Sequence, residues 1–283
     1  MDDSAMHPQP HDTIQHGDCI EGMRRLPDGC ASLVVADPPY NLEKDFGAWK
    51  EREQKARWLP WSKEWIAEAV RILAPGGNIF VYGIHHHLCW IQCHLYEIGL
   101  TYRRQIIWYY ENGFAGYTKT LAAHYEPLLW FSKGDGFTYL PIREPYKSTE
   151  RLKHKIIKNG KEWTPNPEGR LAGDVWRFPT LAGRRFRDEK VDHPTQKPLS
   201  ISQRIVAHFS NPGDLVVVPF AGSGSECLAA AMTGRHYLGF ELNERYIEIA
   251  NERIASWKRG PAQLTLPSQE QLPPQDSPRA SAR

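Results

Sequence analysis

The stretch VVVPFAGSGSECLAAAMTGRHYLGFELNERY, residues 216–246, decides the fold. An apolar run leads into Phe220-Ala221-Gly222-Ser223-Gly224, a helical pattern follows, and a second apolar run ends at Glu241. Glycines let the backbone turn tightly and approach a ligand, and the start of a helix offers free amide groups. Glu241 follows Gly222 by 19 residues and is placed to accept both hydroxyls of a ribose. This unit predicts a nucleoside-containing cofactor.

Two glycines are a weak signal on their own. An ordinary tight strand–helix turn with a surface glutamate would also explain them. The third glycine of a dinucleotide fingerprint is missing, which favours an adenosyl cofactor over NAD.

The remaining chain alternates between strand and helix patterns. A helix is expected over 62–77, capped by Ser62 and stopped by Pro75-Gly76-Gly77. Alternating units with buried apolar strands predict an α/β, Rossmann-like fold, a largely parallel, doubly wound sheet with helices on both faces. The expected strands are 31–36, 78–83, 104–110, 126–132, 214–218 and 236–240, and the further helices are 87–98, a segment around 201–209, 224–233 and 244–257.

Composition divides the chain into three parts. Residues 1–12 and 261–283 are polar and without periodicity, and we predict that both are disordered. Residues 13–260 form the ordered domain, into which a loop-rich segment at about 133–192 is inserted. From Arg143 to Lys190 there are thirteen Lys and Arg against seven Asp and Glu, so this insertion is basic and suited to a polyanion.

Bulk features point to a cytosolic protein. Five cysteines, an odd number, fit a reducing compartment, and no apolar run is long enough to span a membrane. His85, Cys89 and Cys93 share one helical face, but the spacing is not that of a zinc finger and such cysteines are often simply buried. We therefore expect no metal site.

The segment VVADPPYNL, residues 34–42, is the second informative stretch. Pro39 has no amide proton to donate, and Pro38 pushes Asp37 out of helical geometry. The backbone at residues 37–40, after the end of this strand, is therefore stiff and extended. This segment, called the ledge below, presents a carboxylate, a peptide carbonyl and the ring of Tyr40.

Three motifs in this order, DPPY (37–40), HPTQKP (193–198) and FAGSG (220–224), resemble those of the β-class amino-methyltransferases of DNA. The resemblance covers about residues 13–257 and makes 13–260 a methyltransferase domain with a target-recognition segment at about 133–192. It implies transfer of a methyl group from S-adenosylmethionine to an exocyclic base nitrogen of duplex DNA. DPPY, and DVWRFPTLAG at 174–183, favour the adenine N6 branch.

The resemblance also implies roles for individual residues. Asp37 and the carbonyl of Pro38 would accept the two N–H bonds of the target amine, Pro39 would keep them fixed, and Tyr40 would stack on a base flipped out of the duplex. Asp18 would bind the adenine of the cofactor, and Lys197 would pair with its methionine carboxylate. The implied cofactor-binding residues are Asp18, Cys19, Asp37, Thr195, Gln196, Lys197, Phe220, Ala221, Gly222, Ser223, Gly224 and Glu241.

Duplex DNA is the expected partner, and a homodimer is a further expectation from the family. The protein would be cytoplasmic, of bacterial or phage type, and associated with the nucleoid. The residues expected to contact DNA are Arg143, Lys147, Lys153, Lys155, Arg184, Arg185 and Arg187.

One position departs from the family. Val218 stands where an acid usually precedes the Pro-Phe of the glycine loop, and that acid helps to hold the cofactor. A DNA-binding protein with impaired catalysis therefore stays an alternative. Methylation of cytosine N4 is the nearest alternative, and methylation of protein glutamine or RNA is a more distant one.

Overall fold

The structure is a computed structural model that describes residues 11–47, 49–112 and 121–260. Most of the two segments predicted to be disordered, residues 1–10 and 261–283, lies outside the described residues. No helix in the described part of the chain is both long and apolar enough to cross a membrane.

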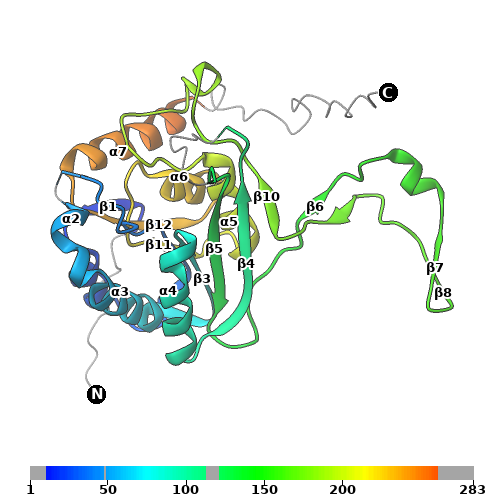
Figure 1. The fold of residues 1–283 in the computed structure, drawn as a ribbon, viewed down its shortest axis with the longest axis horizontal. Helices are drawn as coiled ribbons and strands as arrows, with labels where there is room; N and C mark the ends of the chain where they lie inside the picture. Colours follow the sequence, from blue (N-terminus) through cyan, green and yellow to red (C-terminus); the bar gives the residue numbers. More distant parts are fainter. Residues whose placement is uncertain (1–10, 48, 113–120, 261–283) are drawn as a thin grey trace.

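The described residues form an eight-stranded sheet with the strand order β1-β12-β11-β2-β3-β5-β4-β10 (Figure 1). Neighbours pair in parallel except β5, which runs antiparallel to both β3 and β4. The prediction of a largely parallel sheet is confirmed. The strands are β1 Thr13–His16, β2 Ala31–Ala36, β3 Leu73–Tyr82, β4 Thr101–Tyr109, β5 Tyr125–Ser132, β10 Val175–Arg177, β11 Leu215–Val218 and β12 His236–Glu241.

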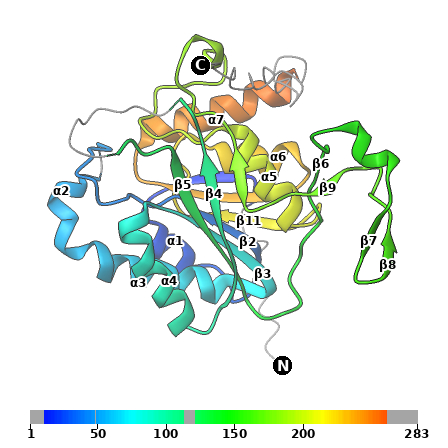
Figure 2. The same ribbon diagram turned by 45° about the vertical axis from the view of Figure 1, so that its right-hand side comes forward.

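Helices cover both faces of the sheet, as predicted (Figure 2). Side chains alternate along β2, so that Leu33 and Val35 join one apolar cluster and Val34 and Ala36 join the other. One face packs against α1 Cys19–Arg24, α3 Trp58–Ile72 and α4 His85–Glu97, and the other against α5 Leu199–Phe209, α6 Ser225–Met232 and α7 Glu244–Arg259.

The helix predicted at 62–77 begins four residues earlier and ends five residues earlier. Ser62 does not cap it, because its hydroxyl donates to the carbonyl of Trp58 one turn back. The ammonium of Lys133 donates to the carbonyls of Val70 and Leu73 and so satisfies the end of the helix. Residues 73–77 then belong to β3, where the amide of Gly76 donates to the carbonyl of Lys133.

The amino-terminal unit β1–α1 was not predicted. β1 has only four residues and lies at the edge of the sheet beside β12. A short strand carries too few alternating positions to be recognised from the sequence. Two short elements, α2 Glu51–Gln54 and the 3-10 turn η1 Lys55–Arg57, were likewise not predicted.

The basic insertion is more ordered than its sequence suggests. Its last strand, β10, pairs in parallel with β4 and extends the main sheet. The preceding part, residues 143–171, projects from the body and is called the arm below (Figures 1 and 2). The arm contains β6 Arg143–Glu144 paired with β9 Arg170–Leu171, the 3-10 turn η2 Thr149–Lys153, and the hairpin β7 Ile156–Lys158 with β8 Lys161–Trp163.

Candidate active site

A cavity opens at the carboxyl ends of β1, β2, β11 and β12, where doubly wound sheets bind ligands. It measures about 970 Å³ including its solvent-open mouth, which is in the range of cofactor sites. The strand-end segments that line it are Gly17–Cys19 after β1, Asp37–Tyr40 after β2, Pro219–Ser223 after β11, and Phe240–Leu242 at the end of β12. Because β11 pairs directly with β2, the glycine loop and DPPY lie side by side.

Two donors fix the Asp37 carboxylate. The hydroxyl of Tyr40 donates to Oδ1 at 2.6 Å, and the ammonium of Lys197 lies 2.9 Å from Oδ2. Burial, followed by the charges of Asp37 and Glu126, raises the pKa of Tyr40 well above its ordinary value, so this hydroxyl stays a donor. Each carboxylate oxygen keeps a lone pair for a further donor.

Hydrogen bonds also hold the backbone of this ledge. Trp58 donates its indole N–H to the carbonyl of Pro39 at 2.7 Å. The buried carboxylate of Glu51 accepts the amides of Asn41 at 2.8 Å and Leu42 at 2.6 Å. Among the described residues, no hydrogen bond is made to the carbonyl of Pro38, which leaves that oxygen as an acceptor for a ligand.

Lys197, two residues before α5, connects this helix to β2 and β5. Its buried ammonium lies between Asp37, at the end of β2, and Glu126 on β5, 3.4 Å away. The rings of Tyr40 and Tyr82 are each 5.1 Å from the same nitrogen. Burial alone would lower the pKa of Lys197, but Asp37 and Glu126 outweigh it and raise the pKa, so the lysine is charged. Lys197 also lines the cavity, and its pairing with a cofactor carboxylate stays a prediction.

A third acid lies beside this ion cluster. Glu226, the second residue of α6, lines the cavity and accepts a hydrogen bond from the hydroxyl of Ser202 at 2.9 Å. Burial and the charge of Asp37 raise the pKa of Glu226. The raised pKa means that Glu226 binds a proton more readily than an exposed glutamate does.

The glycine loop, residues 220–224, and Glu241 form the side of the cavity that faces the expected cofactor. The amide of Gly222 donates to Glu241 Oε2 at 2.8 Å, which turns this carboxylate toward the loop. Gly222 has φ +48°, and a Cβ there would lie 2.9 Å from the His193 ring. Gly224 has φ +75°, and a Cβ there would lie 2.6 Å from the Cβ of Ala250 on α7. Both positions therefore require glycine.

Asp18 begins α1 and reaches the same cavity. Its Oδ1 accepts the amides of Ile20 and Glu21 as a helix cap, and the residue lines the cavity. Cys19 also lines the cavity, and burial raises the pKa of its thiol, so it acts as an apolar wall. Phe220 packs on Trp61 and Trp65, with ring centroids 5.6 Å and 5.3 Å away.

Two predicted cofactor residues do not line the cavity. Gln196 braces its own loop: its amide group donates to the carbonyl of Glu189 and accepts the amide of Val191. Gly224 packs beneath α7. The other ten residues of the predicted cofactor set all line the cavity.

The seven basic residues predicted to contact DNA fall into two groups. Four are on the arm, where Glu150 pairs with Lys153, Glu162 pairs with Lys155, and Arg143 donates to the carbonyl of Gly169. Lys147, the fourth arm residue, is exposed. The remaining three, Arg184, Arg185 and Arg187, are on or next to the 3-10 turn η3 Arg184–Phe186.

Three acids of the site were not predicted as functional: Glu51, Glu126 and Glu226. Glu126 stands in an otherwise apolar strand, YEPLLWFS, and an ionisable residue in such a strand is the signal that would have found it. Glu51 and Glu226 carry no comparable signal, because Glu51 accepts amides of the irregular loop before it and Glu226 contacts Ser202 on another helix. Val218 is buried in the apolar core.

Comparison with known proteins gives a consistent match. A family model described as a DNA methylase, of the N6 and N4 type, matches residues 31–252. The type II methyltransferase M1.MboII of Moraxella bovis is 32% identical over 250 residues, which cover 84% of this chain and 94% of that protein. The DNA adenine methyltransferase YhdJ of Escherichia coli is 31% identical over 246 residues, which cover 86% of this chain and 82% of that protein.

Solved structures agree with the fold. A protein of Thermus thermophilus described as a candidate DNA modification methylase superimposes with a TM-score of 0.59 at 26% identity, covering 86% of this chain and 94% of that chain. Its complex with S-adenosylmethionine superimposes with a TM-score of 0.58 at 25% identity, covering 86% and 93%.

We predict that His193 makes stability depend on pH. Burial lowers its pKa to about 4, and its Nδ1 accepts the amide of Thr195, which requires an unprotonated nitrogen. An unfolded histidine titrates near 6.5, so between pH 6.5 and 4 the unfolded chain binds a proton that the folded chain lacks. The free energy of unfolding should therefore fall by about 2 kcal/mol from this group between pH 7 and pH 5.

Urea denaturation at both pH values, with His193→Gln as the paired variant, measures this contribution. The variant should lose less stability than the wild type on going from pH 7 to pH 5. Equal losses in the two proteins would show that His193 does not carry the effect.

Proposed function

Because this chain belongs to the N6/N4 DNA methylase family, we propose that its cavity transfers the methyl group of S-adenosylmethionine to the N6 amino group of adenine in DNA. The observation that carries the proposal is the fixed Asp37 carboxylate beside the open carbonyl of Pro38, next to the glycine loop. These two acceptors match the two N–H bonds of an exocyclic amine.

The residues of the cavity fit the cofactor. Glu241 offers a carboxylate for ribose hydroxyls, and Asp18 offers a carboxylate for the amino group of adenine. Phe220 and the buried Cys19 offer apolar contact for a ring. Thr195 and Ser223 add hydroxyl groups to the lining. When bound, S-adenosylmethionine supplies an electrophilic methyl group on a sulfonium.

Asp37 and Pro38 act on the nucleophile. The lone pair of the target nitrogen is delocalised into the base, and hydrogen bonds from its two N–H groups to fixed acceptors favour the pyramidal form whose lone pair can attack. Bound S-adenosylmethionine would supply the methyl group to this nitrogen, and its sulfur would keep the electron pair of the broken carbon–sulfur bond. The nitrogen then loses one proton, and the Asp37 carboxylate is the adjacent acceptor.

The target base must leave the duplex to reach this ledge. Tyr40 lines the cavity next to Asp37 and offers a ring for stacking, although its hydroxyl is engaged with Asp37. The adenine target is supported by YhdJ, a relative named as a DNA adenine methyltransferase, and cytosine N4 is not favoured. The alternative of a DNA-binding protein with impaired catalysis is motivated by Val218. The product assay described below distinguishes it from the proposal.

DNA is the substrate, and the arm with the η3 turn is the proposed contact surface. A homodimer and a cytoplasmic location are further parts of the proposal. No disulfide links any of the five cysteines, which suits a reducing compartment. Light scattering of the purified protein would measure the oligomeric state.

Asp37→Ala should abolish methyl transfer while leaving DNA affinity within about twofold, because the variant removes an acceptor and no phosphate contact. The assay uses unmethylated DNA and cofactor with a labelled methyl group, followed by nucleoside analysis. Asp135→Ala, at an exposed carboxylate paired with Arg103, is the control and should retain full activity.

The wild-type product decides between the alternatives. Label in N6-methyladenine is the expected result. Label in N4-methylcytosine would overturn the target, and absence of label in a protein that binds both DNA and cofactor would establish the non-catalytic alternative.

Replacing Lys147, Lys153 and Lys155 together by alanine should weaken DNA binding at every sequence tested. The slope of log affinity against log salt should shrink by about 0.9 for each phosphate that the variant no longer neutralises. Affinity for S-adenosylmethionine should stay the same, because the arm projects away from the cavity-bearing body. Lys63→Ala, an exposed position on α3, is the control. An unchanged slope in the triple variant would remove the arm from the DNA interface.

A further inference from the structure

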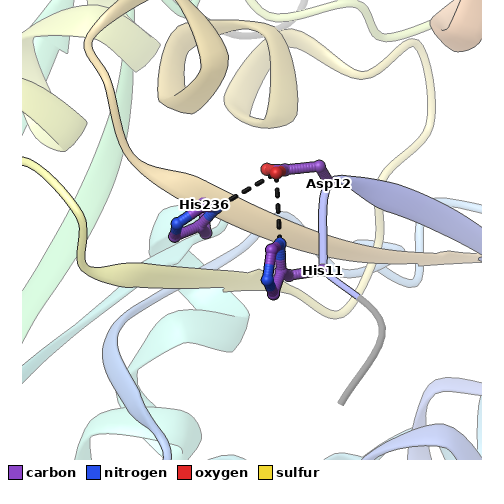
Figure 3. Close-up of side chains that lie close together, drawn as sticks. All are labelled: His11, Asp12 and His236. Atoms are coloured by element: carbon purple, nitrogen blue, oxygen red, sulfur yellow. Dashed lines mark hydrogen bonds and ion pairs between the residues drawn. The ribbon is translucent and has the colours of Figure 1, made fainter. Parts of the chain in front are cut away.

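The described residues bring three metal-ligating side chains together outside the cavity (Figure 3). His11 and Asp12 directly precede β1, and His236 begins β12, 224 residues after Asp12. The parallel pairing of β1 with β12 brings the two segments together. The methyl-transfer chemistry uses none of these three residues.

The three ligating atoms already lie close to the spacing of a metal site. Asp12 Oδ2 is 3.1 Å from His11 Nδ1 and 3.0 Å from His236 Nδ1. All three atoms lie within 4.8 Å of one another. Ligands on a tetrahedral zinc ion with bonds of about 2.0 Å are about 3.3 Å apart, so small side-chain shifts would admit an ion.

The backbone holds the carboxylate in position. The amide of Asp12 donates to the carbonyl of Tyr237 at 2.6 Å. Its φ of +61° is one that aspartate tolerates better than most residues, and the carboxylate lies between the two imidazoles. The side chains of His11 and His236 are 50% and 45% exposed, which leaves room for water as a fourth ligand.

We propose that His11, Asp12 and His236 form a binding site for a divalent transition-metal ion, with Zn²⁺ as the best fit. Two imidazoles and one carboxylate suit Zn²⁺, Co²⁺ and Ni²⁺, whereas Mg²⁺ and Ca²⁺ prefer oxygen ligands alone. Each imidazole presents a bare Nδ1 to the ion and carries its proton on Nε2. The ion links the two residues before the edge strand β1 to the first residue of β12.

This site lies at the amino ends of β1 and β12, whereas the cavity lies at their carboxyl ends. The four residues of β1 separate the two sites by about 13 Å. The ion has no place in the transfer step, so the proposal stands or falls independently of the proposed function.

Untagged full-length protein, treated with a chelator and dialysed, would be titrated with Co²⁺ and followed by visible absorption, and with Zn²⁺ by calorimetry. The expected result is one site per chain, with the d–d bands of cobalt bound to nitrogen and oxygen. Affinity should fall at least tenfold in His236→Ala and in His11→Ala. His154→Ala, an exposed histidine on the arm, is the matched control and should bind as the wild type does.

His11 lies ahead of the first strand, so His11→Ala keeps the test sound if His236→Ala fails to fold. Equal affinity in the wild type and His11→Ala would overturn the proposal, as would the absence of binding. A cobalt–thiolate charge-transfer band would also overturn it, because it would assign the ion to a cysteine.

Discussion

The contact between the Lys197 ammonium and the Asp37 carboxylate is the constraint on which the active site depends. It joins the start of α5 to the end of β2 and, through Glu126, to β5. Burying such a pair is costly, and the cost is offset only when the geometry is good and the remaining donors and acceptors are satisfied. Tyr40 and the surrounding aromatic rings meet this requirement. The same contact holds the carboxylate in one orientation.

The two walls of the cavity are held in different ways. On the nucleophile side, the carbonyl of Pro39 and the amides after Tyr40 are tied to Trp58 and Glu51, so the ledge is rigid before any ligand arrives. On the cofactor side, the amide of Gly222 donates to Glu241, so the position of the proposed ribose acceptor and the loop conformation are coupled. Preorganised acceptors of this kind require little rearrangement when the reaction takes place.

The sequence predicted several of the long elements well. The strands predicted at 31–36 and 214–218 were found at Ala31–Ala36 and Leu215–Val218, because buried parallel strands and glycine turns leave local signals. The boundaries of α3 were wrong, because a distant lysine, Lys133, ends the helix. The partner of Lys197 and the role of Glu226 depend on contacts between separate segments, which no local pattern records. The role of Glu51 depends on the path of the irregular loop before it, whose amides it accepts.

The rate constant of methyl transfer in a single turnover, at saturating cofactor and DNA, tests the central claim most directly. It would be compared between the wild type and Lys197→Met, with circular dichroism to show that the variant folds. The account predicts that Lys197→Met lowers this rate constant about a hundredfold or more, because the Asp37 carboxylate loses the ammonium that orients it. A rate constant close to the wild-type value in folded Lys197→Met would contradict the account.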